Sequence, residues 1–140
     1  MSKPIIETYY HDGDGYNPFF IRDHWQVAQL NYLPELGMQA IKKMEMHAAT
    51  DEIFVLIKGT AILILGIKEE NEFSFELTKM KIGVTYNIPI GAWHGIAMSP
   101  DAEVIIVEKS NTHLEDVTYH NLSLEEQGKL NEAITVLLEN

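Results

Sequence analysis

Short apolar runs, each bounded by turn-forming residues, recur along most of the chain. Several of them alternate between apolar and polar positions, and their spacing of roughly 8 to 12 residues is typical of an antiparallel sandwich or barrel. The pattern predicts about eight strands. They are residues 19–33, 41–47, 52–58 and 60–65, followed by the stretches FSFEL, VTYNI, IAM and AEVIIVEK, with a hairpin turn at 68–72.

The C-terminal segment has a different periodicity. Ser123 and Glu126 have the Ser-x-x-Glu spacing of a helix-capping box. The apolar residues that follow lie mostly at helical spacing: Leu124, Leu130, Ile134, Leu137 and Leu138. We therefore predict one amphipathic helix over about residues 124–138. Packing on the outside of the sheet is the favoured arrangement, and docking on a partner subunit is the alternative.

Length and composition limit the classes of protein that this chain can be. Its 140 residues fit one domain, with the strands in 1–122 and the helix in 123–138. The absence of cysteine excludes disulfides and thiol chemistry, and the formal net charge of −11 disfavours nucleic-acid binding. No apolar stretch is long enough to span a membrane, and the N-terminus lacks the apolar run of a signal peptide. We predict a cytoplasmic protein with no nucleic-acid or membrane partner.

The stretch EMHAATDEIFVLIKG places ionisable residues just ahead of an apolar strand. Glu45 and His47 are two positions apart and share one face of the preceding strand, whereas Glu52 opens the next. Ionisable groups in an apolar interior are costly unless something compensates them, and a divalent cation accepts both imidazole nitrogen and carboxylate oxygen. Spacing alone is equally consistent with a polar hairpin end that lies in water.

A second stretch, GVTYNIPIGAWHG, resolves this ambiguity when it is taken together with the first. Pro89 ends one strand because it cannot donate to a ladder, and His94 opens the next after a turn. The two stretches together resemble the two motifs of the cupin superfamily. The first motif reads Gly, five residues, His-x-His, three or four residues, Glu, six residues and Gly. His47, Glu52 and Gly59 match it, whereas Glu45 occupies the position of its first histidine and Gln39 that of its first glycine.

The second cupin motif reads Gly, five residues, Pro-x-Gly, two residues, His, three residues and Asn. Gly83, Pro89, Gly91 and His94 all match it, and Met98 replaces the asparagine. The resemblance implies an all-β cupin jelly roll, that is, a double-stranded β-helix barrel, here followed by a C-terminal helix. Cupin barrels often bind one divalent metal ion through three histidines and a glutamate.

By this resemblance, His47, Glu52 and His94 are ligands of one divalent metal ion, which could be Fe, Mn, Ni or Zn. The departure from the motif is Glu45. It is consistent with a fourth ligand, with a hydrogen-bond acceptor beside the ligands, with a general base, or with a lineage that has lost its metal. A bound cation opposes the raised pKa that a general base requires, so the ligand role ranks above the base role.

The fold does not define the reaction, because cupins host many activities. One hypothesis is a metal-dependent oxygenase, isomerase or lyase that acts on a small polar metabolite, with no residue assigned a catalytic role. The alternative is a non-catalytic small-molecule-binding or sugar-binding cupin, with or without metal. Phe54, Tyr86 and Trp93 are candidates to line the ligand pocket.

Two further expectations do not rest on the motif residues themselves. His24 lies beside Trp25 in the first predicted strand, so one of the two is expected to face the core. We also predict a homodimer, because cupins of this size commonly pair through their sheets. Met44 and Met46 form an apolar strand face that such a dimer could bury.

Overall fold

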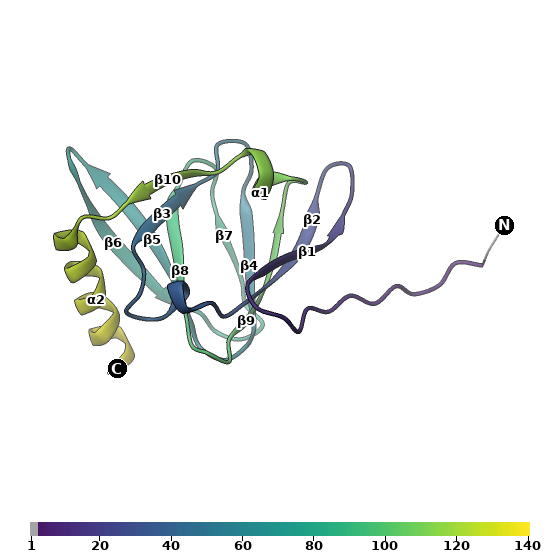
Figure 1. The fold of residues 1–140 in the computed structure, drawn as a ribbon, viewed down its shortest axis with the longest axis horizontal. Helices are drawn as coiled ribbons and strands as arrows, with labels where there is room; N and C mark the ends of the chain where they lie inside the picture. Colours follow the sequence, from purple (N-terminus) through teal and green to yellow (C-terminus); the bar gives the residue numbers. More distant parts are fainter. Residues whose placement is uncertain (1–2) are drawn as a thin grey trace.

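The structure is a computed structural model that describes residues 3–140. Strands dominate it, with one short and one long α-helix and one short 3-10 helix (Figure 1). The elements are β1 (Tyr16–Ile21), β2 (Gln26–Asn31), η1 (Pro34–Leu36), β3 (Lys43–Met46), β4 (Glu52–Lys58), β5 (Ala61–Glu69), β6 (Glu72–Lys79), β7 (Thr85–Ile88), β8 (Trp93–Met98), β9 (Glu103–Glu108), α1 (Thr112–Glu115), β10 (Thr118–Asn121) and α2 (Leu124–Leu138).

The strands form two five-stranded sheets that lie face to face (Figure 1). The first sheet has the order β1-β2-β9-β4-β7, and the second has the order β10-β3-β8-β5-β6. All paired strands are antiparallel, and within residues 3–140 no strand pair joins one sheet to the other. The predicted all-β architecture is therefore confirmed, but as a sandwich of two sheets and not as a closed barrel.

The main hydrophobic core fills the space between the two sheets. Alternation along each strand directs every second side chain into it. In β5, Ala61 and Leu63 face this core, whereas Ile62 and Ile64 face the opposite way. The buried residues of this core are Ala28, Leu30, Phe54, Leu56, Ala61, Leu63, Met80, Ile88, Ile96, Met98, Ala102, Val104 and Ile106.

A second core lies on the outer face of the second sheet, beneath α2. It explains why β5 is apolar at consecutive positions, since both faces of that strand are buried. Its buried residues are Ile41, Met44, Ile62, Ile64, Phe73, Ala97, Leu122, Leu130 and Ile134. The predicted helix over 124–138 is thus confirmed, and it packs on the sheet of its own chain (Figure 1).

A capping box begins α2 and also attaches it to the sheet. The Ser123 side chain accepts a hydrogen bond from the Glu126 amide, and the Glu126 carboxylate accepts one from the Ser123 amide at 2.8 Å. The second oxygen of Glu126 accepts a hydrogen bond from the Phe73 amide of β6 at 2.7 Å. These three hydrogen bonds satisfy three backbone amides where the helix meets the sheet.

The prediction of one strand over residues 19–33 is wrong. This segment is a hairpin in which β1 and β2 pair across a turn at residues 22–25. The turn is closed by a hydrogen bond from the Arg22 amide to the Trp25 carbonyl at 2.9 Å. His24 and Trp25 are therefore both exposed, and neither faces the core as the alternation argument had predicted.

The short elements α1 and β10 were not predicted. β10 pairs with β3 along its whole length, from Thr118 opposite Met46 to Asn121 opposite Lys43. Met44 is fully buried in the second core beneath α2, so this strand face is not the free dimer surface that the sequence suggested. Among residues 3–140, no helix has both the length and the apolarity that crossing a membrane requires.

Candidate metal centre

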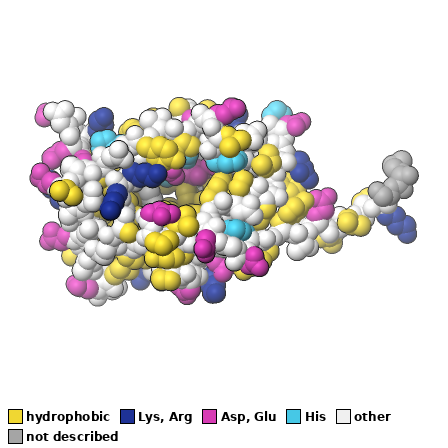
Figure 2. All heavy atoms as spheres, in the orientation of Figure 1, with side chains coloured by type: hydrophobic (Ala, Val, Ile, Leu, Met, Phe, Trp, Pro, Cys, Tyr) yellow, Lys and Arg dark blue, Asp and Glu magenta, His cyan; other side chains and the backbone are white. Residues whose placement is uncertain are grey.

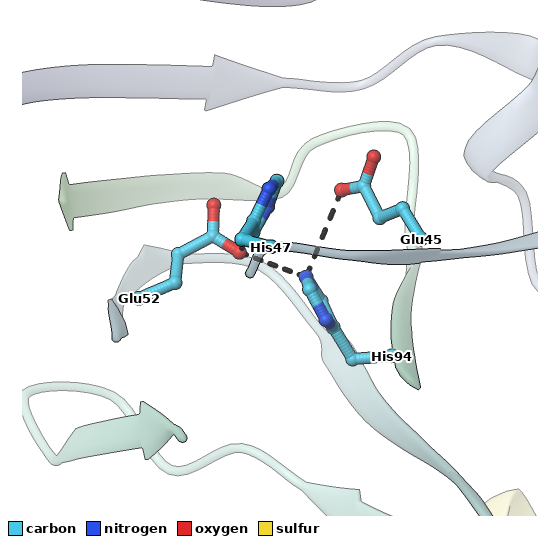
Figure 3. Close-up of side chains that lie close together, drawn as sticks. All are labelled: Glu45, His47, Glu52 and His94. Carbon is cyan, nitrogen blue, oxygen red and sulfur yellow. Dashed lines mark hydrogen bonds and ion pairs between the residues drawn. The ribbon is translucent and has the colours of Figure 1, made fainter. Parts of the chain in front are cut away.

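Four residues from three segments converge between the two sheets. Glu45 lies on β3 and pairs with His94 on β8, His47 directly follows β3, and Glu52 is the first residue of β4. One donor atom from each residue lies within 4.8 Å of all the others (Figure 3). His47, Glu52 and His94 are buried, and Glu45 is partly exposed. The structure thus brings together all four predicted residues, including the one that departs from the cupin motif.

Glu52 lies at the centre of this cluster. Its Oε1 atom is 2.8 Å from His94 Nε2 and 3.3 Å from His47 Nε2 (Figure 3). The same nitrogen of His94 is 3.7 Å from Glu45 Oε1. The Nε2 atoms of two histidines that lie far apart in the sequence therefore approach the same oxygen of Glu52, and that of His94 also approaches Glu45.

Backbone carbonyls hold both imidazole rings in the orientation that a metal ligand needs. His47 Nδ1 is 2.6 Å from the Asp116 carbonyl oxygen, and His94 Nδ1 is 3.0 Å from the Ala92 carbonyl oxygen. Because a carbonyl only accepts hydrogen bonds, each Nδ1 carries a proton and donates it. In the neutral ring, Nε2 then presents its lone pair to the cluster, which is the usual arrangement of a histidine that binds metal.

The Nε2 atom of His47 has no hydrogen-bond partner among the described residues, although it is buried. Its 3.3 Å separation from Glu52 Oε1 satisfies an ion-pair distance but not the geometry of a hydrogen bond. A buried polar atom without a partner is costly, and a cation between the four donors would satisfy it. The residues present therefore fit a divalent metal ion.

The pKa values of the two histidines also support a cation at this site. Burial lowers the pKa of His47, but the adjacent Glu52 carboxylate and the hydrogen bond to the Asp116 carbonyl, together with the charge of Glu45, outweigh it and raise this pKa to about 9. The pKa of His94 is raised for the same reasons, against an opposing effect of burial. Both carboxylates thus favour positive charge at the imidazoles, and a divalent ion among the four donors would supply that charge.

A hydrogen-bonded group behind Glu52 was not predicted from the sequence. Glu108 on β9 lies opposite Glu52 on β4, and its Oε1 accepts hydrogen bonds from the Tyr16 hydroxyl at 2.6 Å and the Gln26 amide at 3.2 Å. Burial, and then the neighbouring carboxylate of Glu52, raise the pKa of Glu108. Burial also opposes ionisation of Glu52, but both imidazoles lower its pKa below the usual range.

The two carboxyl groups belong to residues that face each other across the β4–β9 pair, and their pKa values shift in opposite directions, so Glu52 ionises more readily than Glu108. The alternation along β9 contained a signal for this residue. Glu108 continues the series of Val104 and Ile106, both of which face the core between the sheets.

The four residues line one wall of a cavity of about 570 Å³. Phe54 also lines this cavity, as predicted, but Tyr86 and Trp93 do not. Trp93 precedes His94 on β8 and so faces the other side of the sheet, where its ring lies 5.8 Å from that of Phe73. Tyr86 lies on the edge strand β7, and its hydroxyl accepts a hydrogen bond from the Lys81 amide. Figure 2 shows one face of the molecule hollowed, with hydrophobic and charged side chains around the opening.

Comparisons with solved structures identify the fold. No family model and no curated protein matches this sequence. A solved cupin-2 domain-containing protein from Shewanella frigidimarina NCIMB 400 is similar, with a TM-score of 0.51 and 17% identity over 71% of this chain and 84% of that one. Oxalate decarboxylase is similar with a TM-score of 0.50 and 18% identity, over 71% of this chain and 24% of that one.

A third similar structure is Peruvianin-I, described as a cysteine peptidase from Thevetia peruviana latex. It has a TM-score of 0.51 and 11% identity over 71% of this chain and 58% of that one. The present chain thus spans most of the cupin-2 protein but only about a quarter of oxalate decarboxylase. These likenesses establish the fold. The two antiparallel sheets with a C-terminal helix are the cupin double-stranded β-helix fold that the two sequence motifs predicted.

Proposed function

We propose that this protein binds one divalent metal ion through His47, His94, Glu52 and Glu45, and that it acts on a small molecule held in the adjoining cavity. One observation carries the proposal. Both imidazoles are tied at Nδ1 to backbone carbonyls, so that their Nε2 atoms converge on two carboxylates at the wall of a cavity. Such a constellation is expected where a cation is held and where a ligand can reach it.

The mixed donor set suits several transition metals. Two imidazoles and a carboxylate are a known Fe(II) set, and a second carboxylate adds an oxygen donor of the kind that Mn(II) favours. Ni and Zn are also candidates, because both ions accept imidazole nitrogen as a ligand. When bound, the ion would supply Lewis acidity toward a carbonyl or hydroxyl oxygen of the ligand. An oxygenase, an isomerase or a lyase would each use this chemistry.

The residues of this chain would position the ligands. The carbonyls of Asp116 and Ala92 orient the two rings, and Glu108, which is held by hydrogen bonds from Tyr16 and Gln26, lies beside Glu52. Glu45 has the most exposed side chain of the four, at 38%. It lies on the side of the cluster from which a ligand could arrive. We assign it as a ligand, because a neighbouring cation would lower the pKa of a general base there.

The activities named for the similar structures do not transfer as a whole. Cysteine peptidase chemistry requires a cysteine nucleophile, and this chain has none. The chain spans only a small part of oxalate decarboxylase, so that reaction is no more than one candidate for a metal-dependent cupin.

Elemental analysis of the purified, reconstituted protein tests the proposal. We expect about one equivalent of Fe, Mn, Ni or Zn per chain, since the four donors form a single site. A metal content near zero after reconstitution would contradict it. If small molecules still raised the melting temperature of that metal-free protein, the alternative of a non-catalytic ligand-binding cupin would be favoured instead.

Metal affinity should also depend on pH. The pKa of His47 is about 9 in the metal-free protein, so a metal ion must displace its proton at neutral pH. Each displaced proton makes the apparent affinity rise about tenfold per pH unit, so binding should strengthen from pH 6 to 8 and weaken in acid. Competition with a metal-binding dye, corrected for the dye's own protonation, measures this slope. An affinity independent of pH would mean that neither imidazole binds the ion.

We propose further that the chain forms a homodimer, although through a surface other than the one predicted. The outer face of the first sheet carries Val27, Ile53, Val55, Ile105 and Val107, which are only partly buried and adjoin one another across β2, β9 and β4. The extended N-terminal arm, with an exposed apolar pair at residues 5–6, projects from the body near this sheet (Figure 1). A second copy could cover both apolar surfaces.

Sedimentation velocity at micromolar concentration tests the dimer. We expect twice the 15.9 kDa mass of the chain, and we expect Val107→Lys to shift the species to the monomer. A wild-type protein that sediments as a monomer would contradict this proposal. The cytoplasmic location inferred from the sequence stays a prediction.

A further inference from the structure

We infer that the ligand of this cavity has an apolar body and a single metal-binding head with at most one negative charge. The inference rests on the proposed metal centre. It concerns a different part of the site, namely the cavity wall away from the four ligands. It excludes small dicarboxylic acids and sugars as good ligands.

The cavity wall beyond the metal centre is mostly apolar. Leu30, Phe54 and Ile106 come from the first sheet, Ile96 comes from the second, and Leu36 and Val117 come from the segments that flank the cavity; all six line it. A sugar would place several hydroxyl groups against these side chains, which offer no hydrogen bonds. Each hydroxyl buried without a partner costs free energy, so a sugar is a poor fit.

Charge limits the head of the ligand. The two carboxylates proposed to bind the metal, those of Glu45 and Glu52, match the charge of one divalent ion. A bound monoanion therefore leaves one net negative charge in a buried site, and a dianion leaves two. Apart from histidines, the basic side chains in the cavity lining are those of Lys42 and Lys43, and both are exposed. Lys43 Nζ lies 4.1 Å from the centre of the Tyr119 ring. Among residues 3–140, no lysine or arginine is buried in the cavity to balance a second carboxylate.

The size of the cavity argues in the same direction. A volume of 570 Å³ corresponds to about twenty water molecules at roughly 30 Å³ each. A dicarboxylate as small as oxalate would leave most of this space filled with water against an apolar wall. A longer alkyl or aryl body displaces that water, and each buried methylene strengthens binding about fourfold.

Calorimetric titration with a homologous series of 2-hydroxy acids tests the inference on the metal-loaded protein. The series is glycolate, 2-hydroxybutanoate, 2-hydroxyhexanoate and 2-hydroxyoctanoate, which share one head and differ only in their chains. We expect Kd to fall about fourfold per methylene until the cavity is full. We expect 2-hydroxysuccinate, a dianion, to bind at least tenfold more weakly than 2-hydroxypentanoate. A Kd that is independent of chain length, or tighter binding of the dianion, would overturn the inference.

A pair of variants places the effect in the cavity. Leu36→Asn introduces a polar group into the lining, whereas Leu124→Asn makes the same change at a leucine that is 86% exposed on α2. The first should flatten the dependence of Kd on chain length, and the second should leave it unchanged. Should Leu36→Asn not fold, the wild-type series alone still decides the outcome.

Failure of the metal centre can be told apart from failure of this inference. If elemental analysis finds no metal, the proposed function is wrong, and so is the inference that the ligand has a metal-binding head. A series of 1-alkanols on the metal-free protein then tests the apolar body, because alkanols need no metal. Affinity that rises with alkanol length supports the apolar body, and affinity that does not rise overturns it. If metal is bound but the 2-hydroxy acids show no dependence on chain length, the metal centre stands and the apolar ligand is wrong.

Discussion

The His94→Ala variant is expected to lose its metal ion. His94 Nε2 lies within 2.8 Å of Glu52 and 3.7 Å of Glu45, so its removal leaves the proposed site with three donors. Loss of a residue that merely orients a ligand costs about 10- to 100-fold in metal affinity. Loss of the ligand itself should cost more than about 100-fold and lower the bound metal from about one equivalent to almost none. Elemental analysis after gel filtration measures the change.

The matched control is His24→Ala. His24 is exposed in the turn between β1 and β2, far from the cluster in the sequence and absent from it in space. Its variant should keep the full metal content, and His47→Ala should behave like His94→Ala. A folded His94→Ala protein that retains one tightly bound equivalent would contradict the assignment of the site. The far-ultraviolet circular dichroism and melting temperature of each variant show whether the protein is folded.

The Leu130→Ala variant should be strongly destabilised. Leu130 has no exposed surface and lies in the second core between α2 and the sheet. Truncating such a buried leucine removes apolar burial and leaves a cavity, which together lower the free energy of unfolding by about 2–5 kcal/mol. Urea denaturation of the wild type and the variant measures the difference.

Leu124→Ala provides the control on the same helix. Leu124 is 86% exposed, so its truncation should change the free energy of unfolding by less than about 0.5 kcal/mol. This pair of variants tests whether α2 is part of the folding unit. Equal and small effects for both variants would contradict the packing of α2 on its own sheet, and would favour the alternative in which this helix docks on a partner subunit.

The elements that the sequence predicted well are those whose signals are local. The helix over 124–138 begins with a capping box and has an apolar face, and β4 begins and ends where its alternation does. Gly59, a motif glycine, ends β4 with φ of +77°. A Cβ atom there would lie 2.6 Å from the Ala102 backbone, so this position requires glycine.

The errors arose where the local pattern was ambiguous. The aromatic and β-branched residues of 19–33 resemble one long strand, and the turn that divides them contains neither glycine nor proline. β10 was missed because its stability comes from pairing with β3, which lies some seventy residues away. The direction of Met44 was ambiguous for the same reason, since the helix that covers it follows much later in the chain.

The same contrast between local sequence signals and long-range contacts applies to the candidate site. The resemblance of residues 45–59 and 83–94 to the two cupin motifs predicted the fold and named His47, Glu52 and His94 as ligands. Strand alternation added Glu45, because residues two positions apart share a face. Only the tertiary structure decided that their donor atoms meet within 4.8 Å, and that Asp116, from a segment with no sequence signal, orients His47. The position of Glu108 beside Glu52 and the apolar wall of the cavity were likewise not predicted from the sequence. Both depend on which strands lie side by side, and that arrangement follows from packing across the two sheets and not from any local pattern.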